Sequence, residues 1–123
     1  MESKISSYRD LTVWQKSMNL VDHIYDATES FPQEEKFGLS SQMQRAAVAI
    51  PSNISEGHLR GTRKEYARFI SIALASSGEL DTQLEIARRR KYLLESNWEQ
   101  LNHETDEVKK MLSSLYKKLI YIK

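Results

Sequence analysis

The chain is built around residues 39–57, LSSQMQRAAVAIPSNISEG, which combine a helical apolar pattern with an internal proline. Apolar residues recur there every three or four positions and so share one side of a helix of about five turns. They are Leu39, Met43, Ala46, Ala47, Ile50 and Ile54. Pro51 has no amide hydrogen and crowds the carbonyl four residues earlier, so we expect a bend there while the helix continues. We expect Gly57 to close this helix in a left-handed conformation.

The composition is that of a single water-soluble domain. The 123 residues are 28% charged and 40% hydrophobic, which suits one packed core. The absence of cysteine excludes disulfides, thiolate metal sites and a cysteine nucleophile, and no apolar run approaches the roughly 20 residues that span a bilayer. We therefore expect a cytoplasmic protein with a polar N-terminal arm, residues 1–9, and one domain, residues 10–123. The net charge of +1 gives no general attraction to nucleic acid.

The same spacing of apolar residues predicts a helix before this stretch. Asp10 or Thr12 is expected to cap it, and its pattern stops near Thr28. Its expected core residues are Val13, Trp14, Met18, Val21, Ile24 and Tyr25. Residues 33–38 are ambiguous, because Pro32 can open a short helical turn there.

Capping residues mark where the other helices begin. Ser40 is expected to cap the helix that contains the proline. Thr62 with Glu65, and Ser96 with Glu99, form two capping boxes that open a third and a fourth helix. The expected core residues of these two helices are Tyr66, Phe69, Ile70, Ala73, Ser77, Leu80, Leu84 and Ala87, then Leu101, Thr105, Val108, Leu112, Leu115, Leu119 and Ile122.

Four helices of about 17 to 28 residues with short turns predict an all-α, antiparallel, up-down-up-down four-helix bundle, with the second helix kinked at its proline. The third helix is expected to run into the basic residues 88–91, where positive charge complements the helix dipole. Residues 73–78, ALASSG, are small, and we expect another helix to cross there.

Several apolar residues lie off the expected core stripes. One interpretation is scattered surface side chains, which are normal. The other, which we favour, is a second apolar seam between copies of the chain, because a helix that is apolar on two sides needs two neighbours. The residues concerned are Ile72, Leu74, Met111, Tyr116 and Ile120.

Polar residues on the second and third helices allow two interpretations as well. They form either a solvated face or a charge-assisted hydrogen-bond network across an interface, which would specify packing or assembly. They are Gln42, Arg45, Asn53, Glu56, Glu79 and Gln83.

Two basic clusters lie at the two ends of the third helix. Clustered cations neutralise phosphates and can bind nucleic acid, but the helix dipole and solubility also explain the second cluster. The first contains Arg60, Arg63, Lys64 and Arg68, and the second contains Arg88, Arg89, Arg90 and Lys91.

No motif for catalysis or metal binding is found. His23, His58 and His103 fall on different predicted segments without ligand spacing, and no Glu-x-x-His pair of the di-iron bundles occurs. No nucleophile elbow, P-loop or dinucleotide fingerprint occurs either. We therefore expect neither an enzyme nor a protein with a metal, a cofactor or a small-molecule substrate.

Four blocks of the chain resemble a known bacterial family. The blocks are DLTVWQKS at residues 10–17, the whole of residues 31–57, KEYARFISIA at residues 64–73 and ELDTQLEIA at residues 79–87. They are similar to the four-helix-bundle family first named for proteins encoded in intervening sequences of 23S ribosomal RNA genes, also labelled S23 ribosomal proteins. The R-A-A-x-x-I-P-x-N-I-x-E-G block is the most specific part of the resemblance.

The resemblance implies an antiparallel four-helix bundle that assembles into homopentameric rings. A related group serves as accessory proteins of diversity-generating retroelements, in which a basic pentamer binds the reverse transcriptase and nucleic acid. This sequence has Ala49, Ser55 and Ala75 where the family usually has Ser, Ala and Gly, and these changes conserve packing. Its nearly neutral charge departs from the basic accessory proteins.

Two hypotheses follow. The first is a non-enzymatic, homo-oligomeric, pentameric helical bundle that acts as a scaffold or adaptor. The second is an RNA- or DNA-binding accessory protein that uses the two basic clusters, with nucleic acid or a nucleic-acid-processing protein as its partner.

Overall fold

The computed structural model describes residues 7–121, and all regular structure in this range is helical. Four long helices are joined by short turns, so the prediction of a four-helix protein without strands is confirmed. The first six residues of the expected polar arm lie outside the described residues. The elements are η1 (Tyr8–Asp10), α1 (Thr12–Thr28), η2 (Gln33–Glu35), α2 (Leu39–His58), α3 (Arg63–Arg89) and α4 (Glu95–Tyr121).

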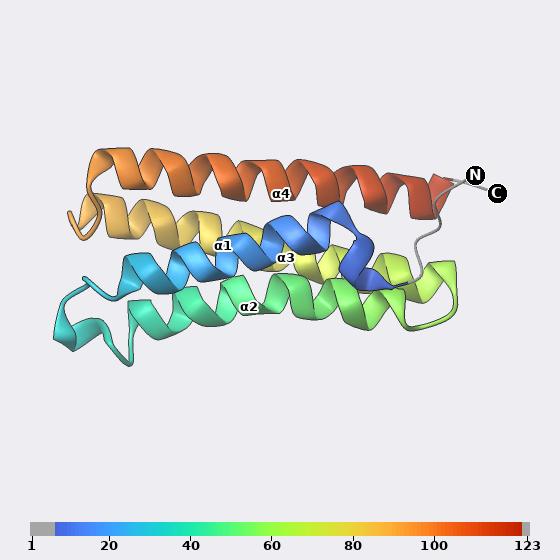
Figure 1. The fold of residues 1–123 in the computed structure, drawn as a ribbon, viewed down its shortest axis with the longest axis horizontal. Coiled ribbons are helices and arrows are strands. Elements are labelled where there is room, and N and C mark those ends of the chain that lie inside the picture. Colours follow the sequence, from blue (N-terminus) through green and yellow to red (C-terminus); the bar gives the residue numbers. More distant parts are fainter. Residues whose placement is uncertain (1–6, 122–123) are drawn as a thin grey trace.

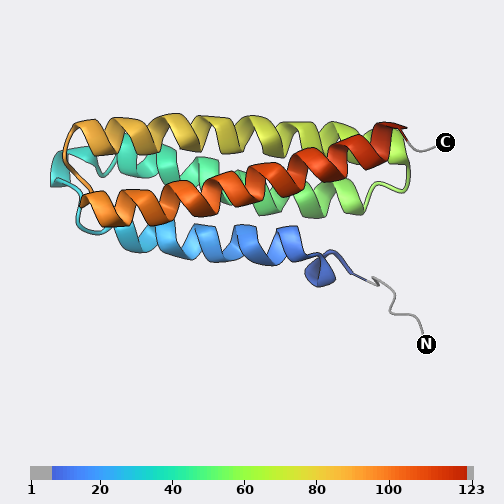
Figure 2. The same ribbon diagram turned by 90° about the horizontal axis from the view of Figure 1, so that it is seen from above.

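The four long helices lie side by side along one axis of the molecule, and the chain reverses direction at each turn (Figure 1). Each helix packs against two neighbours, in the cyclic order α1, α2, α3, α4, and the view from above shows the same arrangement (Figure 2). The turns α1–α2 and α3–α4 therefore lie at one end, which we call the turn end. The α2–α3 turn and the last turn of α4 lie at the other (Figure 1).

The core contains most of the apolar stripes that the sequence predicts for α2 and α3, and the stripe of α4 as far as Leu112. Four of the predicted core residues are only partly buried, namely Leu39, Tyr66, Leu115 and Leu119, and Ile122 lies outside the described residues. The stripe of α1 is rotated from the prediction. Leu20 is fully buried, whereas Met18 and Tyr25 are exposed. The prediction for α1 is confirmed at Val13 and Ile24 and wrong at Met18 and Tyr25. The helix also buries the small polar residues Ser17 and Thr28, whose hydroxyl groups donate to carbonyl oxygens of their own helix. Apolar spacing alone does not reveal such positions.

The expected N-caps are confirmed at one of four helix starts. Thr62 accepts a hydrogen bond from the amide of Glu65 at 3.2 Å. α1 begins instead after Leu11, and α2 begins after Gly38 rather than at Ser40. α4 begins at Glu95, which places the expected capping residue Ser96 within its first turn.

The start of α2 is capped by a carboxylate from the preceding turn. Glu35 of η2 accepts a hydrogen bond on Oε1 from the amide of Leu39 at 3.0 Å. This contact satisfies one of the free amides at the helix start, so α2 needs no side-chain cap from its own boundary residue. The short helical turn that the sequence left open is present as η2.

Gly57 lies inside α2 and is not its left-handed end. α2 continues through Pro51 and ends at His58. A Cβ on Gly57 would lie 2.7 Å from Phe69 Cβ and 3.2 Å from the Tyr66 carbonyl oxygen, so glycine is needed there for the close approach of α3. The left-handed glycine of the α2–α3 turn is Gly61, with φ of 84°. The bend at Pro51 stays a prediction.

α3 ends two residues before the expected Lys91. Lys91 adopts φ of 63°, its amide donates to the Arg88 carbonyl at 3.0 Å, and the amide of Tyr92 donates to the Ala87 carbonyl at 2.9 Å. These two bonds form a Schellman motif, in which lysine takes the position usually held by glycine. A lysine in that conformation gives no local sequence signal.

The small residues 73–78 do not mark a crossing at Gly78. A Cβ built on Gly78 meets nothing within 4 Å among the described residues, so this part of α3 faces open space. Ala73 and Ser77, on the other side of the helix, are fully buried. Gly78 is therefore not the point of closest approach, which lies at Gly57, and the helix crossing expected over residues 73–78 stays a prediction.

Candidate interaction surfaces

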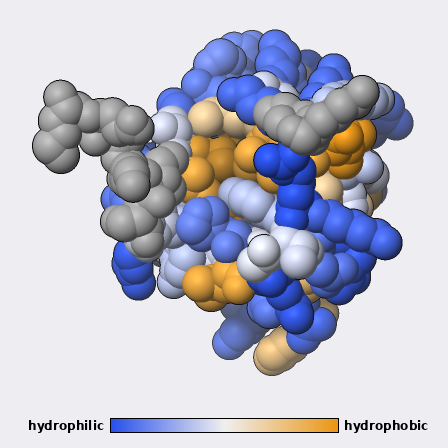
Figure 3. Space-filling model, turned by 90° about the vertical axis from the view of Figure 1, so that its right-hand side faces the viewer, coloured by the Kyte–Doolittle hydropathy of each residue, from blue (hydrophilic) through white to orange (hydrophobic). Residues whose placement is uncertain are grey.

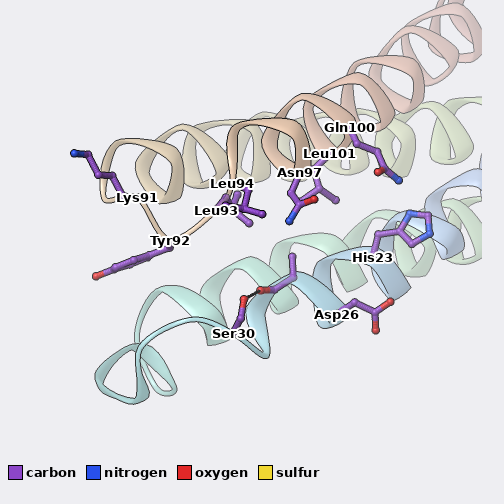
Figure 4. A pocket seen from close by; sticks show the side chains of 11 residues that line it. His23, Asp26, Ser30, Lys91, Tyr92, Leu93, Leu94, Asn97, Gln100 and Leu101 are labelled. Atoms are coloured by element: carbon purple, nitrogen blue, oxygen red, sulfur yellow. Dashed lines mark hydrogen bonds between the residues drawn. The ribbon is translucent and has the colours of Figure 1, made fainter.

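A pocket of about 550 Å³ opens between α1 and α4 near the turn end (Figure 4). Leu93 and Leu94 of the α3–α4 turn and Asn97 of α4 point toward α1, and Asp26 and Ser30 lie on the α1 side (Figure 4). The inner wall is apolar, with Ala27, Leu93 and Leu101 among the lining residues. We call it the α1–α4 pocket. The sequence did not reveal it, because a pocket between two helices depends on how far apart they pack.

Polar contacts hold α1 and α4 together beyond this pocket. His23 Nδ1 and Glu104 Oε1 lie 2.7 Å apart, and Lys16 Nζ lies 3.1 Å from Glu107 Oε2. The side chains of the second pair are about 40% exposed, so water screens the interaction. Gln100 donates a further bond to Glu104 at 3.1 Å.

The α1–α2 turn presents Phe37 to solvent. Its side chain is 90% exposed, which is the largest exposed fraction of any large hydrophobic residue among those described. The backbone around it is held by Glu35, whose Oε2 also accepts a hydrogen bond from the hydroxyl group of Tyr92 at 3.0 Å. Phe31 packs against the same tyrosine ring, with centroids 5.3 Å apart. The turn is therefore tied to α2 and to the α3–α4 turn.

The same contacts lower the pKa of Glu35 below its ordinary value of 4.5. The main cause is the hydrogen bond from the Leu39 amide, followed by the bond from Tyr92, and both favour the ionised carboxylate. The sequence analysis missed Glu35 and Phe37. The available signal was an aromatic residue next to Gly38 that fits no helical apolar stripe.

The first basic cluster is largely compensated by carboxylates and an aromatic ring. Arg60 lies 3.2 Å from Glu56, and Arg68 lies 3.4 Å from Glu65. The guanidinium groups of both arginines lie over the ring of Phe69, at 4.8 and 4.7 Å from its centroid. Lys64 is exposed and makes no ion pair within residues 7–121.

The second basic cluster is divided between paired and unpaired cations. Arg88 lies 2.6 Å from Glu95 and stacks 3.8 Å from the ring centroid of Trp98. Arg89 lies 3.0 Å from Glu85. The bond from Arg89 is the main cause that lowers the pKa of Glu85, and the bond to Glu95 is the main cause that raises the pKa of Arg88. Arg90 and Lys91 are exposed and form no ion pair in the described part of the chain.

The expected polar network is brought together only on α3. Gln83 Nε2 donates to Glu79 Oε2 at 3.2 Å, and Gln83 is buried although its Oε1 has no protein partner. Asn53 donates to the Ala49 carbonyl of its own helix. Gln42 and Arg45 are exposed on α2, and within residues 7–121 no hydrogen bond joins the α2 members to Glu79 or Gln83.

The residues of the expected oligomer seam fall into two groups. Ile72 and Ile120 are exposed. Leu74, Met111 and Tyr116 are partly buried and pack against the core of their own chain.

The end opposite the turn end carries further apolar surface. Figure 3 views this end and shows separate apolar patches between polar side chains. Leu59 of the α2–α3 turn and Ile120 near the end of α4 are exposed there, and Leu119 is partly buried.

No three His, Cys, Asp or Glu side chains of residues 7–121 form a group that could hold a metal ion. Over the same range, none of the helices is both long enough and apolar enough to cross a membrane.

These observations define the chain as an all-α, four-helix-bundle protein with an apolar core, paired surface charges and exposed apolar side chains at both ends. Residues 9–114 match the model of the 23S rRNA-intervening sequence protein family. The match covers most of the chain, and the protein belongs to this family.

A solved structure supports the same assignment. The chain is similar to a protein with unknown function from the S23 ribosomal protein family of Bacteroides thetaiotaomicron, with 27% identity and a TM-score of 0.78. The alignment covers 86% of this chain and 99% of that chain. The comparison with curated proteins finds no match.

Proposed function

We propose that the protein is a non-enzymatic, cytoplasmic, homo-oligomeric scaffold or adaptor, pentameric as the family resemblance implies. The observation that supports this proposal is the set of large apolar side chains left in water on a chain whose core is otherwise well filled. An exposed apolar area larger than a soluble monomer usually carries marks a site of contact with another protein. The most exposed of these side chains are Phe37, Leu59, Leu94 and Tyr121.

A scaffold must hold its binding surfaces in fixed positions and needs no catalytic groups. A four-helix bundle has this rigidity. The long helices share one apolar core, and the Glu35 contacts fix two turns relative to one another. Binding then costs little conformational entropy, because the surfaces that meet a partner are already ordered.

The mass of the full chain in solution tests this proposal. Sedimentation equilibrium or light scattering should give a multiple of the 14.3 kDa of one chain, and the resemblance predicts a multiple of five. A monomer over the whole accessible concentration range would overturn the proposal.

Ile72 tests whether the expected seam on α3 contributes to assembly. Ile72→Asp should lower the measured mass, because it places a charge in an apolar contact. Ser114→Asp adds the same charge at an exposed position of α4 and serves as the control. Equal masses for both variants and the wild type would exclude Ile72 from the seam.

The second candidate function is binding of RNA or DNA. Lys64, Arg90 and Lys91 favour it, since they are exposed cations without an ion pair in the described range. The pairing of Arg60, Arg68, Arg88 and Arg89 with carboxylates argues for weak binding.

Filter binding of a single-stranded RNA at increasing salt tests this alternative. If the protein binds, retention at low salt should fall as salt rises and should fall further in Lys64→Ala and Lys91→Ala. Absence of retention at low salt would exclude the second function and would leave the scaffold proposal untouched.

A further inference from the structure

The exposed Phe37 is presented by a turn that is held in place. Both carboxylate oxygens of Glu35 are engaged, one at the start of α2 and one on Tyr92, and Phe31 packs on that tyrosine. A Cβ on Gly38 would lie 2.8 Å from Glu35 Oε1, so the residue after Phe37 must be small for this arrangement to form. An aromatic side chain on a fixed turn has the properties of a binding hot spot.

The α1–α4 pocket is large enough for an aromatic side chain and is partly apolar. Its volume of about 550 Å³ lies in the range of small-ligand sites, and leucine side chains form much of its wall. Leu94 at its mouth is 71% exposed (Figure 4). An inserted phenyl ring would cover leucine surface that water now contacts.

Each of the two features has one acidic and one basic side chain beside it. Glu34 and Lys36 precede the exposed Phe37 in sequence, and Asp26 and Lys91 line the pocket. All four are without an ion pair within residues 7–121, and Lys36 Nζ lies 5.7 Å from the centroid of the Phe37 ring. When the ring enters the pocket of another molecule, Lys36 can approach Asp26, and Glu34 can approach Lys91.

The positions of the two features suit contact between copies of one chain. Both lie at the turn end, the first beyond the α1–α2 side of the bundle and the second on the α4–α1 side (Figures 1 and 4). A rotation about an axis along the helices therefore brings the turn of one molecule to the pocket of the next at the same height. Repeated contacts of this head-to-tail kind close into a ring when the rotation between successive copies divides a full turn.

We propose that Phe37 of each molecule inserts into the α1–α4 pocket of a neighbouring copy, with Lys36 beside Asp26 and Glu34 beside Lys91. This inference rests on the proposed homo-oligomer and names its contact. The contact lies at the turn end, and each copy offers Phe37 to one neighbour and the α1–α4 pocket to the other.

Sedimentation of full-length variants tests the contact. Phe37→Glu and Leu94→Glu should each lower the mass toward the 14.3 kDa of one chain, because each places a carboxylate in an apolar contact. Both side chains are largely exposed in one molecule, so circular dichroism should show unchanged helix content. Ser114→Asp is again the control, since it adds a carboxylate at an exposed position of α4 outside the proposed contact, and it should keep the wild-type mass.

A charge exchange tests the pairing itself. Lys36→Glu and Asp26→Lys should each lower the mass, and the double variant should restore it. Failure of the double variant to restore the mass would overturn the charge pairing. An oligomeric wild type whose mass survives both Phe37→Glu and Leu94→Glu would overturn the inserted contact and leave the proposed oligomer standing, whereas a monomeric wild type would overturn both.

Discussion

The α2–α3 and α1–α4 interfaces are built in opposite ways. Across α2–α3 the backbones approach so closely that Gly57 leaves no room for a Cβ beside Phe69. Across α1–α4 the helices meet less extensively, a pocket opens between them, and charged side chains span the remainder. The comparison shows one interface closed by a residue without a side chain and another that combines ion pairs with an open pocket. We expect stability to depend on the first interface and binding on the second.

Substitution of two helical glycines provides the strongest test of this comparison. Gly57→Ala should destabilise the protein by about 1–3 kcal/mol, because the new Cβ would overlap Phe69 Cβ and the Tyr66 backbone. Gly78→Ala is the control, since open space surrounds that position and alanine should stabilise the helix by about 0.5–1 kcal/mol. Urea denaturation measures both. A stabilising Gly57→Ala would contradict the close approach.

Loss of the bond between Tyr92 and Glu35 at the turn end should lower stability by an intermediate amount that depends on pH. The pKa of Glu35 is lowered in the folded state, so its contribution to stability is present above the ordinary value of 4.5 and is lost as pH falls through the lowered value. Tyr92→Phe removes one of the two bonds to this carboxylate. The variant should be less stable than the wild type at pH 7, and the difference should shrink toward pH 3. A difference that does not change with pH would mean that the bond does not depend on ionised Glu35.

The smallest effect should follow from breaking an α1–α4 ion pair. Glu107→Gln removes the partner of Lys16, and exposed pairs of this kind contribute about 0.2–1 kcal/mol. Added salt should reduce the difference between variant and wild type. A loss as large as that of Gly57→Ala would show that α1–α4 is not the weaker interface.

The helices and most of the core could be predicted from the sequence because periodicity is a local property. The buried stripe of α2 and the Thr62 cap follow from residues that are neighbours in the chain. The family resemblance also depends on blocks of local sequence, and the match of residues 9–114 to the family model confirms it.

The remaining features depend on contacts between distant segments. The role of Gly57 is set by Phe69 on the next helix, and that of Glu35 by Tyr92 on the α3–α4 turn. The α1–α4 pocket likewise depends on how two helices are spaced across the bundle. Residue spacing gives no measure of these distances, so the α1–α4 pocket and the turn that presents Phe37 emerged only from the structure, whereas the basic clusters were visible in the sequence.

The bond between Glu35 and Tyr92 also has a kinetic consequence. The two residues are 57 positions apart, so the bond can form only after the chain between them has been brought into place. We expect it to be absent from the folding transition state. Its loss in Tyr92→Phe should therefore leave the refolding rate nearly unchanged and accelerate unfolding, so that this single hydroxyl group prolongs the lifetime of the native state.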